Sequence, residues 1–169
     1  ISEDQNGEVS YEIDLENKPK RKVYSQLVIW VNLKIHHVGY AVDSIEEGIK
    51  ILETLGFKID SNIFSDVKRK VKIVFMSKDE MKIELVAPLS VDSPVSKFLS
   101  KNGPSPYHIC YSTDDIYKTV DELKQLKFIQ ISEIEDAIAF SDKKVVFMYS
   151  KSIGILELVE GAGKWKKKR

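Results

Sequence analysis

The same pattern of apolar and polar positions occurs twice along the chain. In each copy a stretch of period two, typical of a strand, is followed by apolar residues at helical spacing and then by three more strand-like stretches. The copies align without a gap over residues 37–57 and 108–128, and after two one-residue shifts they align at Glu84 and Glu157. Two copies of this length indicate a duplicated module rather than a solenoid array.

Each copy predicts the element order β-α-β-β-β. For the first copy we expect a strand at 35–42, a helix begun by Asp43 or Ser44 and ended at Gly56, and strands at 57–63, 71–77 and 81–87. For the second we expect a strand at 107–113, a helix at 115–126 capped by Asp114, and strands near 127–132, 143–149 and 154–160. The connection between the copies predicts a linker at 88–94 and a short helix at 95–99.

These elements predict an α+β fold in which a central domain at 34–162 contains two tandem βαβββ modules, 34–88 and 106–160. The segment 1–33 is expected to be an extension with a loose polar start and a β-hairpin from 9 to 33. An isolated hairpin is marginally stable in water, so it must pack on the main body or on a second subunit. It would be an edge extension of the sheet, the arm of a homodimer or the remnant of a fused upstream domain. Residues 163–169 form a basic tail that we expect to be a solvated terminus.

Composition excludes several classes of partner. The 26 basic residues equal the 26 acidic residues in number, so no net field favours nucleic acid or a membrane surface. The longest apolar run, 27–31, is far shorter than the roughly 20 residues of a membrane helix. The single cysteine, Cys110, excludes an internal disulfide and fits a reducing compartment, so we expect a cytoplasmic protein.

Four polar residues recur in register at the start and end of the two copies: His37 and His108 begin them, and Glu84 and Glu157 interrupt the final apolar strands. A single core histidine or strand glutamate is ordinary, but the repetition favours a shared site. If the modules pair by pseudo-twofold symmetry, the four side chains meet in one cleft. The small neighbours on the strand faces of the histidines leave room for a cavity; they are Gly39, Ala41, Cys110 and Ser112.

Two imidazoles and two carboxylates form a mixed nitrogen and oxygen donor set. Such a set suits a divalent Zn, Co, Ni, Fe or Mn ion without selecting narrowly among them. With four protein ligands, a six-coordinate ion would keep two positions for water or substrate.

At these residues the chain resembles the vicinal oxygen chelate superfamily and, within it, most resembles methylmalonyl-CoA epimerase. The segments that carry the resemblance are 37–42, 83–89, 92–103, 108–110 and 156–160, of which the Ser-Pro…Lys-Phe-Leu…Lys-Asn-Gly linker at 93–103 is the most specific. The resemblance covers about residues 34–160. It implies a curved mixed sheet around a central cleft, and it implies that His37, Glu84, His108 and Glu157 are the metal ligands.

The chemistry implied by the resemblance is proton exchange at the carbon alpha to a thioester of an acyl-CoA or related substrate. A metal ion would spread the enolate charge while one base removes the proton and an acid on the opposite face returns one. Glu157 would be one of these groups.

The chain departs from the family pattern at two places. Lys68 stands where the epimerases carry their second catalytic glutamate, so Asp66 or Lys68 is the expected replacement. A glycine-rich loop of the family is replaced by residues 136–142. Lys68, Arg69 and Lys70 are then candidates for binding the CoA phosphates, with a solvated strand end as the plain alternative.

Other functions share this fold. A glyoxalase I-type lyase uses the same ligand types but lacks support from the linker and from an Arg near the first strand. An extradiol dioxygenase needs three ligands, which leaves Glu84 surplus. A non-catalytic binding or accessory protein, or a biosynthetic-pathway enzyme, would fit the loss of the second base. A second acid/base across the cleft from Glu157 would distinguish these functions.

Overall fold

The computed structural model describes residues 2–3, 9–10, 31–141 and 143–161, and the chain divides into two units, 1–30 and 31–169. In the first unit, β1 (Ser2–Glu3) pairs antiparallel with β2 (Val9–Ser10). The expectation that the first eight residues lack structure is therefore wrong at Ser2 and Glu3. Most of the predicted hairpin, 11–30, lies outside the described residues, as does the basic tail. Residues 31–33, the described end of its second strand, are not in a strand.

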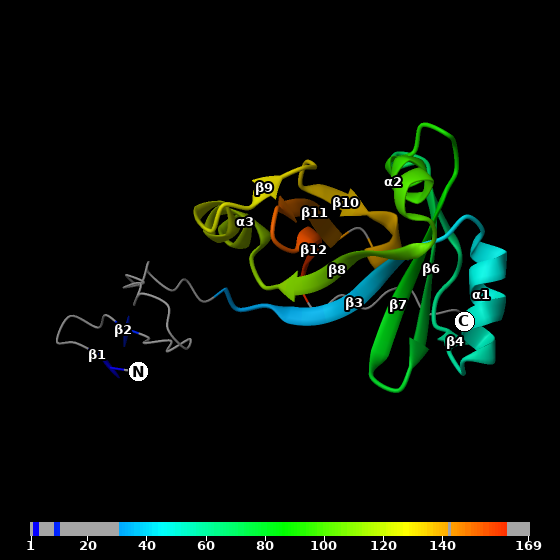
Figure 1. The fold of residues 1–169 in the computed structure, drawn as a ribbon, viewed down its shortest axis with the longest axis horizontal. Coiled ribbons are helices and arrows are strands. Elements are labelled where there is room, and N and C mark those ends of the chain that lie inside the picture. Colours follow the sequence, from blue (N-terminus) through cyan, green and yellow to red (C-terminus); the bar gives the residue numbers. More distant parts are fainter. Residues whose placement is uncertain (1, 4–8, 11–30, 142, 162–169) are drawn as a thin grey trace, which may run out of the picture. The chain divides into compact units, whose positions relative to one another are not determined.

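The second unit contains the two predicted modules (Figure 1). The first consists of β3 (Lys34–Ala41), α1 (Ile45–Thr54), β4 (Lys58–Ile59), β5 (Phe64–Asp66), β6 (Val71–Lys78) and β7 (Met81–Pro88). Helix α2 (Pro94–Asn102) connects it to the second, which consists of β8 (Ser105–Thr113), α3 (Ile116–Gln125), β9 (Ile129–Gln130), β10 (Glu135–Ala137), the 3-10 turn η1 (Ile138–Phe140), β11 (Lys143–Ser150) and β12 (Gly154–Glu160).

The strands of both modules form one mixed sheet in the order β10-β11-β12-β8-β3-β7-β6-β4, with β5 paired to β6 and β9 to β11. The order is symmetric about its centre, where β3 and β8 pair antiparallel and join the modules. Within each module the first and last strands pair in parallel, β3 with β7 and β8 with β12. The pseudo-twofold arrangement expected from the repeat is thus the observed one.

Each helix of the modules covers the sheet face of its own copy. Tyr40 of β3 and Val42, just after the strand, pack in one cluster with Ile45 and Ile49 of α1, as their alternation predicted. Ser44 is the N-cap of α1 and accepts from the backbone N–H of Glu47. In α3 the cap is Asp115, not Asp114 as expected.

The expected strands at 57–63 and 127–132 are each reduced to two residues, β4 and β9, and a further short strand that the sequence did not predict follows each of them, β5 and β10. In both copies a serine hydroxyl accepts from the backbone N–H of a phenylalanine on the neighbouring strand, Ser61 from Phe75 and Ser132 from Phe147, each at 2.9 Å. A side-chain oxygen here takes the place of a ladder carbonyl, which ends the regular pairing. Strands β5 and β10 resume beyond these serines and border the cleft.

Helix α2 runs from 94 to 102 and is longer than the predicted 95–99. Ser93 caps it by accepting from Val95 N–H, Pro94 occupies the first turn, and Gly103 (φ 67°) ends it. Among the helices in the described part of the chain, none is long and apolar enough to span a bilayer.

Candidate metal centre

The four residues singled out by the repeat lie on the four central strands of the sheet, β12, β8, β3 and β7. They form two cross-strand rows, each with a small residue in the middle. Gly39 pairs with Glu84 on one side and His108 on the other, and Cys110 pairs with Glu157 and His37. Because the rows are adjacent, the four side chains converge on one point, and all four are buried.

Their donor atoms are mutually close. His37 Nε2 lies 3.2 Å from His108 Nε2, 3.5 Å from Glu84 Oε2 and 3.3 Å from Glu157 Oε2. His108 Nε2 lies 3.3 Å from each of the same carboxylate oxygens. Two ligand atoms that each bond one ion at about 2.0–2.1 Å are about 3.0–3.4 Å apart. The spacing therefore fits coordination of a single divalent ion.

Hydrogen bonding within the site points the same way. Glu157 Oε2 is 3.3 Å from both imidazole Nε2 atoms, yet among the described residues it has no hydrogen bond of acceptable geometry. A buried oxygen without such a partner carries a large desolvation penalty. A cation at the meeting point of the four donor atoms would remove that penalty, and the donor set is one that Zn, Co, Ni, Fe and Mn accept.

Burial and opposite charge act against each other on these groups. Burial alone would lower the pKa of His37, but Glu84 and Glu157 outweigh it and raise that pKa. The same balance raises the pKa of His108 to about 10. Burial would raise the pKa values of Glu84 and Glu157, but the histidines hold both below their usual range. Without a metal, protons on the two histidines therefore balance the charge of the two carboxylates. A divalent ion must displace these protons when it binds.

This balance predicts a pH optimum for the stability of the metal-free protein. His108, whose pKa rises on folding, adds stability that is fully present below about 6.5 and lost as the pH approaches about 10. The carboxylates add stability that is present above 4.5 and lost below it. Calorimetry of the metal-free protein should therefore give the highest melting temperature between pH 4.5 and about 6.5.

Added cobalt should reverse the loss on the alkaline side, because its affinity grows as the histidines lose their protons. If the melting temperature of the metal-free protein rose steadily from pH 6.5 to 10, the raised pKa of His108 would be contradicted.

The small size of Gly39 suggested that it leaves room for a cavity. In the structure Gly39 instead allows the ring of His108 to approach the backbone of β3 closely. A Cβ at Gly39 would lie 2.1 Å from Cε1 and 2.4 Å from both nitrogens of the His108 ring. The ring of His108 therefore occupies the space that any side chain at 39 would take. The sequence pattern identified Gly39 as a small neighbour of His37, but not as the residue that makes room for the imidazole of His108.

A cavity of about 440 Å³ opens onto this cluster. Glu84, His108 and Glu157 contribute to its lining, and apolar side chains including Val71, Val145 and Phe147 form its walls. The loop after β5 and the strand β10 form its rim. An apolar cavity with a few convergent polar groups is the usual form of a small-molecule site.

Asp66 and Lys68 both line this cavity, as a second acid/base must, but each already has a polar partner. Asp66 accepts from the backbone N–H of Arg69 at 2.9 Å and from its guanidinium at 2.7 Å, one bond to each carboxylate oxygen. Lys68 Nζ lies 2.6 Å from Glu135 Oε2, with 71% of its side chain exposed.

The other two cations of the 68–70 run are also paired. Arg69 reaches across the cleft to the Asp136 carbonyl and to Glu135 Oε2, and Lys70 forms an ion pair with Asp92. Asp136, the first residue of the segment that replaces the family's glycine-rich loop, therefore holds the opposite rim through its backbone carbonyl. The rim is a network of alternating charges and not a patch of free cations.

Comparisons with known proteins agree with this architecture. Residues 36–147 match the family described as the Glyoxalase/Bleomycin resistance protein/Dioxygenase superfamily. The mitochondrial methylmalonyl-CoA epimerase of Homo sapiens is 33% identical over 128 residues, 75% of this chain and 72% of that protein. The ethylmalonyl-CoA/methylmalonyl-CoA epimerase of Cereibacter sphaeroides is 31% identical over 120 residues, 70% of this chain and 89% of that protein.

Solved structures show the same fold. A hypothetical protein from Bacillus halodurans superposes with a TM-score of 0.68 at 28% identity, covering 82% of this chain and all of that one. Methylmalonyl-CoA epimerase from Mycobacterium tuberculosis superposes with a TM-score of 0.66 at 23% identity, covering 76% and 87%. With its paired modules and its sequence match over most of the domain, the chain belongs to the Glyoxalase/Bleomycin resistance protein/Dioxygenase superfamily, and it is similar to the methylmalonyl-CoA epimerases.

Proposed function

We propose that this protein is a metal-dependent epimerase that exchanges the proton alpha to the thioester of an acyl-CoA. The observation that carries the proposal is the buried set of His37, Glu84, His108 and Glu157, whose donor spacing fits one ion and which opens onto an apolar cavity. A divalent ion held there would supply positive charge that stabilises the oxygen of the thioester as the proton leaves. The similarity to named acyl-CoA epimerases supports this substrate class.

Glu157 is the proposed base of the reaction. The histidines hold its pKa below the usual range, against the effect of burial, so it is a carboxylate at neutral pH. It lines the cavity and can take a proton from a carbon placed there. Epimerisation then needs a second group that gives a proton to the same carbon from the opposite face.

Lys68 and Asp66 are the proposed candidates for this second group, and their contacts rank them. Both oxygens of Asp66 are held by Arg69, so the carboxylate would first have to break two hydrogen bonds. Lys68 is held by one ion pair on an exposed side chain, which is readily exchanged for a new partner. We therefore propose Lys68 as the acid that returns the proton.

Lys68 and Lys70 are also the residues of the rim with enough exposure to meet the phosphates of CoA. Arg69, held between Asp66 and the opposite rim, is proposed to position the loop. Lys70→Ala is expected to raise KM for an acyl-CoA several-fold while kcat stays close to that of the unchanged protein. The comparison substrate is an acyl thioester of N-acetylcysteamine, which has no phosphates and whose KM should not move.

Lys68→Ala provides the contrast, since its proposed role as an acid predicts a fall in kcat for both substrates. Equal effects of Lys70→Ala on the two substrates would show that Lys70 does not contact the phosphates.

The proposed function is tested by solvent deuterium exchange. Protein loaded with cobalt is incubated with methylmalonyl-CoA in deuterium oxide, and incorporation at the alpha carbon is followed by mass spectrometry against a metal-free control. Metal-dependent incorporation is the expected result. Tight cobalt binding without any incorporation, for this or a longer-chain malonyl thioester, would overturn the epimerase proposal.

A second candidate function, binding of an acyl thioester without catalysis, is favoured by one observation. Both candidates for the second acid/base are engaged in ion pairs with neighbouring residues. Binding of the acyl-CoA without deuterium incorporation would support this alternative.

Two further proposals concern the setting of the protein. They are a reducing compartment such as the cytoplasm, in which Cys110 stays a buried free thiol, and a homodimeric assembly. Light scattering tests the latter.

A further inference from the structure

Strand β3 contains a β-bulge next to its metal-site histidine. Ile35 pairs with Tyr111 and His37 pairs with the next residue of β8, Cys110, so the register shifts by one residue at His36. Consecutive residues of a regular strand point to opposite faces, and a bulge alters that alternation. Ile35 is 74% exposed as a result, although the regular pattern placed it with His37 on one face.

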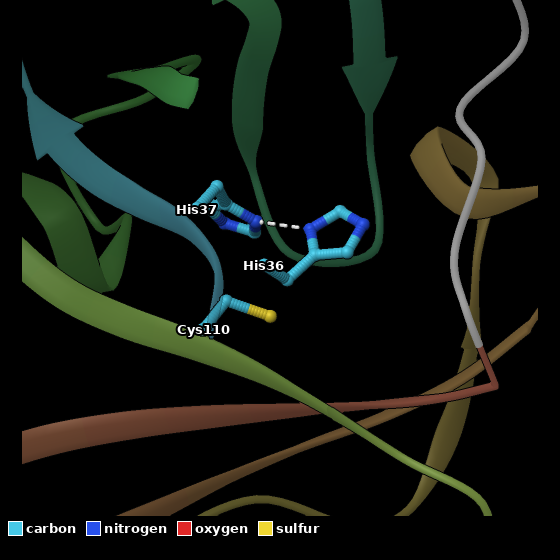
Figure 2. Close-up of side chains that lie close together, drawn as sticks. All are labelled: His36, His37 and Cys110. Carbon is cyan, nitrogen blue, oxygen red and sulfur yellow. Dashed lines mark hydrogen bonds between the residues drawn. The ribbon is translucent and has the colours of Figure 1, made fainter. Parts of the chain in front are cut away.

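The bulge brings two consecutive imidazoles together on one side of the strand. The ring centroids of His36 and His37 are 5.2 Å apart, and both rings contact Phe140, at 5.6 and 5.9 Å. Figure 2 shows the two rings side by side, with a dashed line joining the nitrogens that face each other. Phe140 is itself buried, so it fixes the position of both rings.

The nitrogens that face each other are the two Nδ1 atoms, 2.9 Å apart. At this distance one of them donates a proton to the other. The Nε2 of His37 faces the donor atoms of Glu84 and Glu157, where a metal ligand needs its lone pair. A neutral imidazole whose Nε2 carries the lone pair has its proton on Nδ1, so His37 donates and His36 accepts.

We propose that His36 is a positioning residue of the metal centre: its Nδ1 accepts the Nδ1–H of His37 and so holds His37 in the orientation and tautomer that present Nε2 to a divalent cation. The inference rests on the proposed metal site and adds a residue to it. Partners of this kind keep a ligand in place and make it more basic, and their loss typically weakens metal binding 10–100-fold.

The other histidine of the site has no counterpart to this contact. Within the described ranges, Nδ1 of His108 is buried without a hydrogen-bond partner. The ring of His108 instead lies in the space that a side chain at Gly39 would take. The two copies of the repeat thus orient equivalent ligands by different means, one by a hydrogen bond and one by steric fit.

A second ion is a competing explanation, because His36, His37 and Cys110 also place donor atoms close together (Figure 2). Ligands of one ion are about 3.0–3.4 Å apart when their bonds are about 2.0–2.1 Å long. The 2.9 Å between the Nδ1 atoms is the ordinary length of a hydrogen bond and favours a proton. An ion there would also have to share His37 with the first site.

The experiment compares His36→Phe with His36→Asn. Phenylalanine keeps a ring against Phe140 but removes the acceptor, whereas the Asn side-chain oxygen can occupy nearly the position of Nδ1. Affinity for cobalt is measured by competition with a chelator, which requires no substrate. We expect His36→Phe to weaken binding about 10–100-fold and His36→Asn to restore most of the loss, with similar melting temperatures for the two metal-free variants.

The proton itself is observed by nitrogen-15 NMR of the imidazoles in zinc-loaded protein. The expected result is a protonated Nδ1 on His37 and an unprotonated Nδ1 on His36. Unchanged cobalt affinity in His36→Phe would overturn the proposal, as would equal losses in the two variants. If the protein bound two ions per chain and Cys110→Ser bound one, the contact between His36 and His37 would be explained by a second ion, and the proposal would be overturned. All of these outcomes are independent of whether the protein is an epimerase.

Discussion

Replacement of His108 by alanine is expected to abolish metal binding and alpha-proton exchange together. The substitution removes one of four donors and leaves Glu84 and Glu157 buried with a single imidazole to balance them. A buried carboxylate that loses its partner destabilises a fold by about 3–5 kcal/mol. Exchange should fall by at least about a thousandfold, because several kcal/mol of charge stabilisation is lost and each 1.36 kcal/mol is tenfold. Metal content by mass spectrometry and exchange rate are the two measurements.

Glu157→Gln is the matched control, because it keeps an oxygen donor in the same place but removes the group that accepts the proton. This variant should retain most of its metal while exchange falls by about 10²–10⁴, the usual contribution of a general base. Full retention of metal by His108→Ala would refute the proposed ligand set. Loss of metal in both variants would agree with the proposed ligand set. It would also mean that the role of Glu157 as a base cannot be separated from its role as a ligand.

The repeat is the reason why so much of the fold could be predicted from the sequence. It set the element order, the pseudo-twofold pairing of β3 with β8 and the convergence of four distant side chains, none of which depends on exact strand ends. The same comparison would have corrected the helix caps, since Ser44 aligns with Asp115 and both are the observed N-caps.

What the sequence did not predict arises from contacts between strands. Alternation of period two assumes an unbroken ladder, so the bulge at His36 and the serine contacts of Ser61 and Ser132 could not be read from it. The pairing of Lys68 and Arg69 with Glu135 joins residues of different modules across the cleft. Spacing along the chain contains no information on such pairs, so the basic run resembled a free anion site.

Gly39→Ala is expected to impair the metal centre although residue 39 offers no donor atom. The added Cβ would lie 2.1 Å from the His108 ring, so the ring or the strand β3 must move. Overpacking of this kind destabilises a fold by about 1–3 kcal/mol. The displacement should also take His108 Nε2 out of reach of the ion, so that cobalt affinity falls by about 100-fold or more, the upper range for loss of a supporting contact. Thermal unfolding and chelator competition measure the two effects.

The double variant Gly39→Ala/His108→Ala separates this steric cause from a general effect on the strand. When His108 is truncated, the space that its ring occupied is free, so Gly39→Ala should then be nearly neutral for the free energy of unfolding. The two substitutions are predicted to couple, with the double variant close in stability to His108→Ala alone. Additive losses would mean that Gly39 is required by the backbone of β3 itself. Coupled losses would mean that one glycine on the first module sets the position of a ligand on the second.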